Sequence, residues 1–250
     1  MVLVTAVPGC RALFPSDGRR FEARGVPVGA GMPNLPLDTP AARSRKLATA
    51  WADGPAVLIS VSRSCPVARY RMFDVRWLRQ RLADLSVEFG FAVGLTLIYT
   101  VEAHPAVDPS PYRADGRAWL TPFNRIEGVR IRSAATPADR RAEAARFAAR
   151  HAAGFTLLVD GPDDAAWRAL GGGPNAAAVV DADGKVRARH GWFDGPAVLR
   201  SVRNLIGADG AGLRRARSRR PGRTAGGPFP AGRPAPLRPF RLRAGESPRR

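Results

Sequence analysis

A single cysteine lies between a strand-like run and a long helical pattern, and this arrangement constrains the fold more than any other feature. The run 56–61 is apolar and β-branched, which is typical of a buried parallel strand. Cys65 follows shortly after it, and Pro66 stands where the first turn of a helix tolerates proline. Because backbone N–H groups and the helix dipole stabilise a thiolate at such a position, the sequence predicts a reactive thiol at Cys65.

Strand and helix patterns alternate along the rest of the chain. Apolar residues recur every three or four positions from Tyr70 to Leu85, and Gly90 ends this helical pattern. The other expected elements are a short helix at 41–52, strands at 91–100 and 155–159, helices at 136–151 and 165–170, a hairpin at 176–190 and a final helix at 196–206. Parallel crossovers followed by a hairpin predict an α/β, thioredoxin-like domain with a central mixed sheet flanked by helices.

The positive charge is concentrated at one end of the chain. The formal net charge is +19, and residues 208–250 are rich in arginine, proline and glycine with almost no apolar periodicity. We expect a loop-rich N-terminal extension at 1–40, the thioredoxin-like domain at 41–207 and a disordered basic tail at 208–250. Because the charge lies in a solvated tail, we do not expect functional nucleic-acid binding.

Cysteine and histidine are scarce. The cysteines, Cys10 and Cys65, cannot build a disulfide scaffold, and the three histidines are too scattered for structural zinc. We therefore expect no bound cofactor or metal. No window approaches the ~20 apolar residues that a membrane helix needs, and the apolar start lacks a basic n-region. We expect a cytoplasmic protein without membrane contact.

His104 and Glu102 follow the second predicted strand, at its C-terminal end. Ligands bind at that edge of an open α/β sheet, so both side chains are candidates for a site with Cys65. A histidine there exchanges a proton near neutral pH, and a carboxylate two residues away orients or charges it. The alternative is an ordinary surface histidine in a loop.

Three further positions bear on the chemistry of Cys65. Ser64 is placed to donate a hydrogen bond to the thiolate. Pro174 follows a glycine run and precedes a strand, so it is either the cis-proline that lines thioredoxin-type sites or a plain turn proline. Ala68 stands where a Cys-x-x-Cys motif has its second cysteine, so a second thiol must come from Cys10, a small molecule or another protein. An external thiol reductant is expected.

Two strings of the sequence resemble the iodothyronine deiodinase family. Ser-Arg-Ser-Cys-Pro-Val-Ala-Arg at 62–69 resembles the motif in which selenocysteine follows Ser or Thr and precedes proline. Leu-Ile-Tyr-Thr-Val-Glu-Ala-His-Pro at 97–105 is similar to the family's Tyr-Ile-Glu-Glu-Ala-His-Pro at the same distance. Weaker similarity continues through 157–160, 164–171 and 183–186, and the whole likeness covers about 55–206.

The resemblance implies a thioredoxin fold, a homodimer and reductive removal of halogen from a small aromatic substrate. Cys65 would take the selenocysteine role, His104 and Glu102 would belong to the proton relay and ligand contacts, and Ser64 would support the thiolate. Two departures are clear. Val101 replaces the family's first glutamate, and Ser133, Ala134 and Ala135 stand where the family has a second histidine just before the helix that begins here near Thr136.

Two other hypotheses remain open at this point. A one-cysteine peroxidase also needs a thiolate at a helix start, although Leu58 replaces its usual proline seven residues earlier. A non-catalytic thioredoxin-like binding domain is favoured by the missing second cysteine and the missing second histidine.

Overall fold

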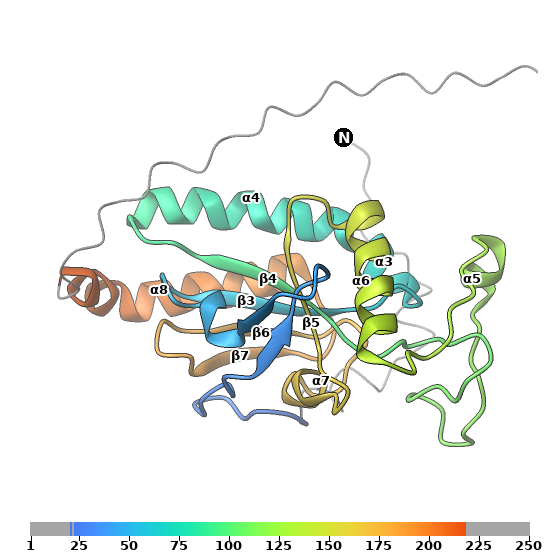
Figure 1. The fold of residues 1–250 in the computed structure, drawn as a ribbon. Helices are drawn as coiled ribbons and strands as arrows, with labels where there is room; N and C mark the ends of the chain where they lie inside the picture. The colour runs from blue at the N-terminus through green and yellow to red at the C-terminus, as the bar shows by residue number, and fades with distance from the viewer. Residues whose placement is uncertain (1–20, 22, 219–250) are drawn as a thin grey trace, which may run out of the picture.

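A computed structural model describes residues 21 and 23–218 (Figure 1). In chain order its elements are β1 (Pro36–Asp38), β2 (Ser44–Lys46), the 3-10 helix η1 (Leu47–Ala50), β3 (Ala56–Val61), α3 (Pro66–Tyr70), α4 (Met72–Phe89), β4 (Gly94–Tyr99), α5 (Pro122–Ile126), α6 (Pro137–His151), β5 (Thr156–Val159), α7 (Ala165–Ala169), β6 (Ala177–Val180), β7 (Val186–His190) and α8 (Gly195–Ser218). The strands form one seven-stranded sheet in the order β2-β1-β5-β4-β3-β6-β7.

The centre of the sheet is parallel and its flanks are antiparallel. β3 pairs in parallel with β4, and β4 pairs in parallel with β5. The β6–β7 hairpin adds to the other side of β3 in antiparallel orientation. The expected thioredoxin-like α/β fold is therefore confirmed, and β3 delivers Cys65 to the C-terminal edge of the sheet.

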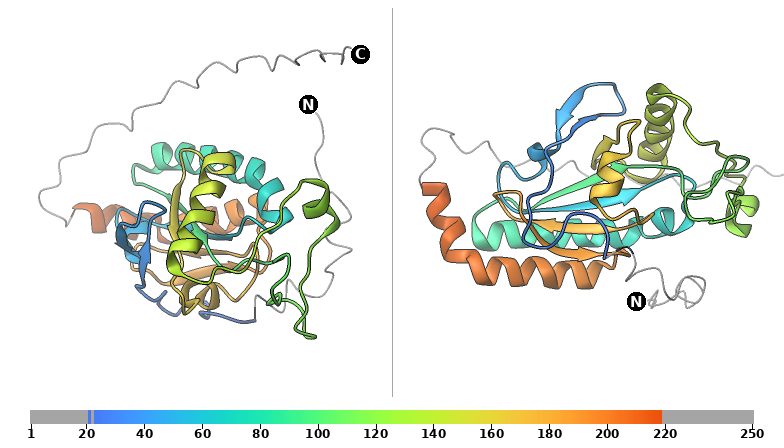
Figure 2. Two further views of the ribbon diagram at one scale, coloured as in Figure 1. Left: turned by 45° about the vertical axis from the view of Figure 1, so that its right-hand side comes forward. Right: turned by 90° about the horizontal axis from the view of Figure 1, so that it is seen from below.

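Side chains on the two faces of β3 enter two separate hydrophobic clusters. Val57, Ile59 and Val61 pack in the cluster that contains the buried faces of α4, α6 and α8. Ala56 and Leu58 pack with η1, α7 and the N-terminal segment. This two-residue alternation is what a strand buried on both faces requires. Figure 2 shows α4 and α8 side by side along one face.

Helix ends follow the signals in the sequence. Gly90 adopts a left-handed conformation with φ 70° and ends α4. Thr136 and Asp139 form a capping box at the start of α6, with Pro137 in its first turn. The helix expected after Cys65 is divided in two, with α3 ending at Tyr70, α4 beginning at Met72, and Arg71 between them at φ −71° and ψ −4°.

The N-terminal half of the sheet differs from expectation. A helix is expected at 41–52, but β1 and β2 form a hairpin and only the short η1 follows it. The expected domain boundary at residue 40 falls in the loop of this hairpin, and β1 joins the main sheet through the Asp38–Val159 bridge. Strands this short carry too little alternation to be recognised from sequence.

The C-terminal helix is longer than expected. α8 continues to Ser218, beyond the predicted end near residue 206. The remainder of the predicted basic tail, 219–250, lies outside the described residues, as does Cys10. Of the helices in the described part of the chain, none has the length and apolar character needed to span a membrane.

Candidate functional site around Cys65

Cys65 caps the N-terminus of α3. Its Sγ accepts a hydrogen bond from the backbone N–H of Ala68 at 3.4 Å, and Pro66 occupies the first turn as expected. The side chain is buried, and it packs in the cluster that contains Val61 and Tyr99. Local sequence thus placed the thiol correctly, at the end of β3 and the start of a helix.

The protonation state of Cys65 differs from expectation. Burial raises the pKa of the thiol from 9.0 to about 11, although the Ala68 N–H and the Arg69 cation both act to lower it. Removal from water destabilises the thiolate by more than the Ala68 N–H and the Arg69 cation stabilise it. The stabilised thiolate expected from the sequence is therefore not favoured in the folded structure, because burial holds the pKa of Cys65 above its ordinary value.

We expect Cys65 to react slowly with iodoacetamide at neutral pH, with a rate that keeps rising up to about pH 11. Only the thiolate is nucleophilic, and burial postpones its formation. The measurement is mass-resolved alkylation of the Cys10→Ser protein, with the same protein unfolded in urea as the control. A native profile that levels off near pH 8.5, like that of an ordinary thiol, would contradict the assigned burial.

Glu102 anchors the loop that carries Cys65. Its Oε2 accepts the backbone N–H of Ser64 at 2.8 Å, and its Oε1 accepts the hydroxyl of Tyr99. Burial raises the pKa of this carboxyl above its ordinary value, while the Ser64 and Tyr99 donors act in the opposite direction. The carboxylate was expected to orient His104, but its hydrogen bonds go to Ser64 and Tyr99 instead.

Ser64 connects both candidate partners to the cysteine. Besides its N–H bond to Glu102, its Oγ accepts the backbone N–H of His104 at 3.0 Å. The Ser64 hydroxyl is engaged with the 102–104 segment, as acceptor from His104 N–H and as a partner of the Glu102 carboxyl. Its expected donation to the thiolate stays a prediction. The same segment is held once more where Ala103 N–H reaches Ser62 Oγ at 3.4 Å.

The His104 ring is buried and neutral. Its plane meets Trp119 edge-on with centroids 4.4 Å apart. The pKa of His104 is lowered to about 4, mainly by burial and also by the Arg69 cation, while a hydrogen bond to the Trp119 backbone acts to raise it. Nδ1 has no hydrogen-bond partner within the described structure, so the bond to Trp119 comes from Nε2–H. Nδ1 is consequently an unoccupied proton acceptor, on a residue whose backbone is attached to Ser64, the neighbour of Cys65.

His104 should make the fold sensitive to acid. A histidine whose folded pKa is depressed contributes stability above its unfolded pKa of 6.5, and this stability is lost as pH falls toward 4. We expect a loss of about 3 kcal/mol over that window in the free energy of unfolding, absent in His104→Gln. Urea titrations at several pH values measure it.

His151→Gln is the matched control for that experiment. The pKa of His151 is also lowered to about 4, but this side chain is only half-buried, so water screens its contribution. We expect a smaller change in the pH dependence for His151→Gln. Equal changes in both variants would contradict the buried placement of His104.

Two buried polar residues, Arg69 and Asn124, hydrogen-bond to the segment just before Cys65. The Arg69 guanidinium donates to the carbonyl of Arg63 and, at 2.8 Å each, to Asn124 Oδ1 and Glu127 Oε2. Asn124 Nδ2 in turn donates to the Ser64 carbonyl at 2.8 Å. The sequence did not identify Asn124 as a site residue. The only local signal is Thr121 followed by Pro122, which marks the start of a helix inside the long loop.

Pro174 does not have the geometry of a cis-proline. Cis peptide bonds are absent from the described part of the chain, so the alternative of a turn proline is the correct one. The neighbouring residues fasten this turn to β3. Ser60 Oγ donates to the Gly173 carbonyl at 2.9 Å, and Asn175 Nδ2 donates to the Ser60 carbonyl at 3.2 Å.

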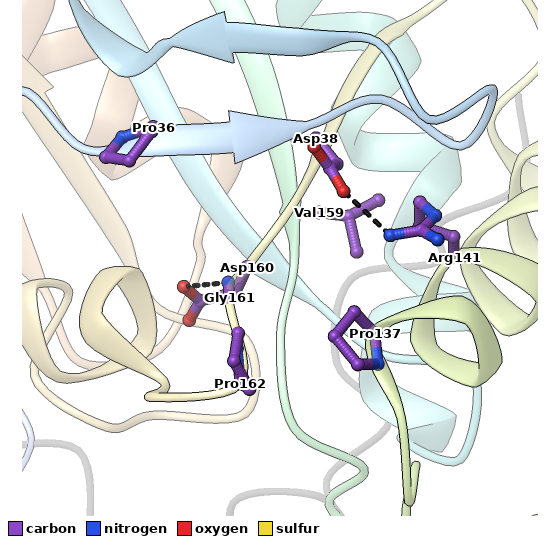
Figure 3. A pocket seen from close by; sticks show the side chains of 8 residues that line it. All are labelled: Pro36, Asp38, Pro137, Arg141, Val159, Asp160, Gly161 and Pro162. Carbon is purple, nitrogen blue, oxygen red and sulfur yellow. Dashed lines mark hydrogen bonds and ion pairs between the residues drawn. The ribbon is translucent and has the colours of Figure 1, made fainter.

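Two cavities lie at the C-terminal edge of the sheet. One, of about 290 Å³, borders the Cys65 loop through Tyr99, Thr100 and Glu102, and it is closed by prolines and by charged residues of α6. The other, of about 240 Å³, lies where β1 meets β5 and is bridged by the 2.8 Å Asp38–Arg141 ion pair (Figure 3). Cys65 lines neither of these two cavities. The described residues include no cluster of three or more side chains suited to hold a metal ion.

Comparison with known proteins assigns the chain to no family. Neither a protein-family model nor a curated protein matches the sequence. Similar solved structures include a putative protein disulfide isomerase from Bacteroides thetaiotaomicron (14% identity, 76% of this chain and 97% of that chain, TM-score 0.47). A putative thiol:disulfide interchange protein DsbE from Chlorobium tepidum gives 17% identity, 74% and 99% coverage, and a TM-score of 0.45. Peroxidoxin BcpB from Mycobacterium tuberculosis gives 16% identity over 72% of this chain and 98% of that chain, with a TM-score of 0.44.

Proposed function

We propose that this protein is a thiol-dependent oxidoreductase that removes halogen reductively from a small aromatic substrate. The observation that carries the proposal is the double attachment of Ser64, which bonds both Glu102 and His104 and stands next to Cys65. This attachment supports a single site made from two segments far apart in the sequence. The resemblance of the same two segments to the deiodinase motifs supports the type of reaction.

The proposed reaction uses Cys65 as nucleophile and His104 as proton carrier. Nδ1 of His104 takes the thiol proton, and the thiolate attacks the halogen atom of the substrate. The sulfur–halogen bond forms while the carbon–halogen bond breaks, and the electron pair stays on the ring carbon. The proton on His104 then passes to that carbon, so the ring is reduced and Cys65 is oxidised to a sulfenyl halide.

Two molecules of external thiol restore the enzyme. The first attacks Cys65 Sγ, expels halide with one proton and leaves a mixed disulfide, which the second resolves to a disulfide and free Cys65. An external reductant is needed because Ala68, whose N–H contacts Sγ, has no thiol to offer. Four points remain predictions: the role of Glu102, the role of His104, the homodimer and the cytoplasmic location.

Arg69 supports the ionised state. Its guanidinium is buried, held by three acceptors, and its Nε–H has no partner among the described residues. A cation in this position lowers the pKa of the Cys65 thiol, in opposition to burial. A thiolate would therefore gain stabilisation that the neutral thiol cannot use.

One observation favours a second function, that of a non-catalytic binding domain. The burial that raises the Cys65 pKa is the usual condition of a structural cysteine.

One assay distinguishes the two functions. The Cys10→Ser protein is incubated with dithiothreitol and either an iodinated phenol or hydrogen peroxide, and iodide release and peroxide consumption are followed. Iodide release supports the proposal, peroxide consumption alone supports a one-cysteine peroxidase, and neither activity supports the binding domain.

A further inference from the structure

Exposed apolar side chains lie on the helix that Cys65 caps and on the neighbouring helices α4 and α5. The most exposed members of this group are Tyr70 at 55%, Phe73 at 72%, Phe123 at 41% and Ile126 at 84%. We call these four residues the aromatic patch. The other large exposed apolar residues in the described part of the chain are valines in three separate segments, Val28, Val87 and Val107. Contiguous apolar surface on a soluble protein marks a site of interaction.

The aromatic patch draws its residues from three helices, α3, α4 and α5. The Tyr70 and Phe123 rings meet edge-on with centroids 6.0 Å apart, which joins α3 to α5. Phe123 and Ile126 are three residues apart in α5 and share a face of that helix. Phe73 lies in the first turn of α4, three residues after Tyr70 and beyond the Arg71 junction. Tyr70 ends the helix that Cys65 caps, about 7 Å further along the axis. The patch is therefore within reach of a protein whose reactive group approaches Cys65.

The rim of the aromatic patch is cationic. Its two carboxylates are already engaged, since Asp74 pairs with Arg71 at 3.1 Å and Glu127 pairs with Arg69 at 2.8 Å. Arg76 and Arg125 form no ion pair with a carboxylate of the described residues, and both are exposed. Two copies of this chain would bring like charges together around the patch. An acidic partner would be attracted to it instead.

We propose that the aromatic patch docks an acidic protein that carries a reduced dithiol and supplies electrons to Cys65. This inference rests on the proposed function, for which it names the class of electron donor. One donor thiolate attacks the oxidised Sγ of Cys65, forms a mixed disulfide and expels the group bound to sulfur as an anion. The second donor thiol then displaces Cys65 as a thiolate, and the donor leaves with its own disulfide.

The test follows reduction of a preformed mixed disulfide. In the Cys10→Ser protein, Cys65 is first converted at high pH to its thionitrobenzoate disulfide, with loading verified by mass. Release of the coloured anion is then timed with a reduced thioredoxin of negative net charge and, separately, with dithiothreitol. The test variant is Phe73→Ser with Ile126→Ser, and the matched control is Val87→Ser with Val107→Ser, which changes equally exposed apolar residues elsewhere.

We expect the patch variant to react at least about tenfold more slowly with thioredoxin and within about twofold of the parent with dithiothreitol. The control variant should match the parent with both reductants. Arg76→Glu with Arg125→Glu should also slow thioredoxin alone, and added salt should slow the parent.

Several results would overturn the docking proposal. These are an unchanged thioredoxin rate in the patch variant, an equal slowing with dithiothreitol, and loss of a dimer in the patch variant while the thioredoxin rate persists. The last result would assign the patch to a second copy of this chain. Because the assay contains no halogenated compound, a failure of dehalogenation leaves its outcome unaffected, and the two proposals can fail separately.

Discussion

Cys65→Ser is expected to lower iodide release from an iodinated phenol by about three orders of magnitude or more. The proposed reaction needs a polarisable nucleophile that ionises and then holds the halogen, and a serine hydroxyl does neither at accessible pH. Cys65→Ala should be equally inactive. The measurement is steady-state iodide release with dithiothreitol as reductant, with far-ultraviolet circular dichroism to verify folding.

Cys10→Ser is the matched control, because it removes the other thiol of the chain. We expect it to retain activity when dithiothreitol supplies both reducing equivalents. Iodide release that survives Cys65→Ser at the parental rate would exclude the proposed mechanism. A loss of activity in Cys10→Ser alone would identify Cys10 as the second thiol.

Glu102→Ala is expected to destabilise the fold by about 3–5 kcal/mol. The substitution leaves the Ser64 N–H and the Tyr99 hydroxyl without their acceptor inside a buried site, and it opens a cavity. The Cys65 loop should loosen as well, because Ser64 is its point of attachment. The measurement is the midpoint and slope of urea unfolding, together with the alkylation rate of Cys65, which should rise as the thiol gains access to solvent.

Glu102→Gln separates the hydrogen-bonding role of this residue from its charge. Burial raises the pKa of the carboxyl, so its contribution to stability is present below the unfolded pKa and declines as pH rises through the folded pKa. The amide imitates the neutral acid, and we expect its stability relative to the parent to improve with rising pH. Glu102→Ala with parental stability would show that the carboxyl does not hold the loop.

Local signals predicted the part of the fold that carries the site. The unbroken apolar run of β3 is what a strand covered on both faces needs, and Thr136 with Pro137 marked the start of α6 through a cap that is purely local. The β6–β7 hairpin was also found, since Asp181 accepts the N–H groups of Asp183 and Lys185 and so stabilises its turn.

The sequence did not predict the elements that are stabilised by contacts between segments far apart in the chain. β1 and β2 are three residues long and exist because β1 pairs across to β5, a contact between segments more than a hundred residues apart. Asn124 gave no signal because its importance comes from its two partners, Ser64 and Arg69, which only the folded loop brings to it.

The position of the thiol, at the end of a central strand and the start of a helix, can be read from local sequence, because strand periodicity and proline preference are local properties. Its protonation depends on the tertiary structure. Local groups act to lower the pKa of Cys65, but the surrounding packing removes water and raises it to about 11. Tertiary structure also joined Ser64 to Glu102 and His104 and left Nδ1 of His104 without a partner, since burial and hydrogen bonding depend on residues distant in the chain.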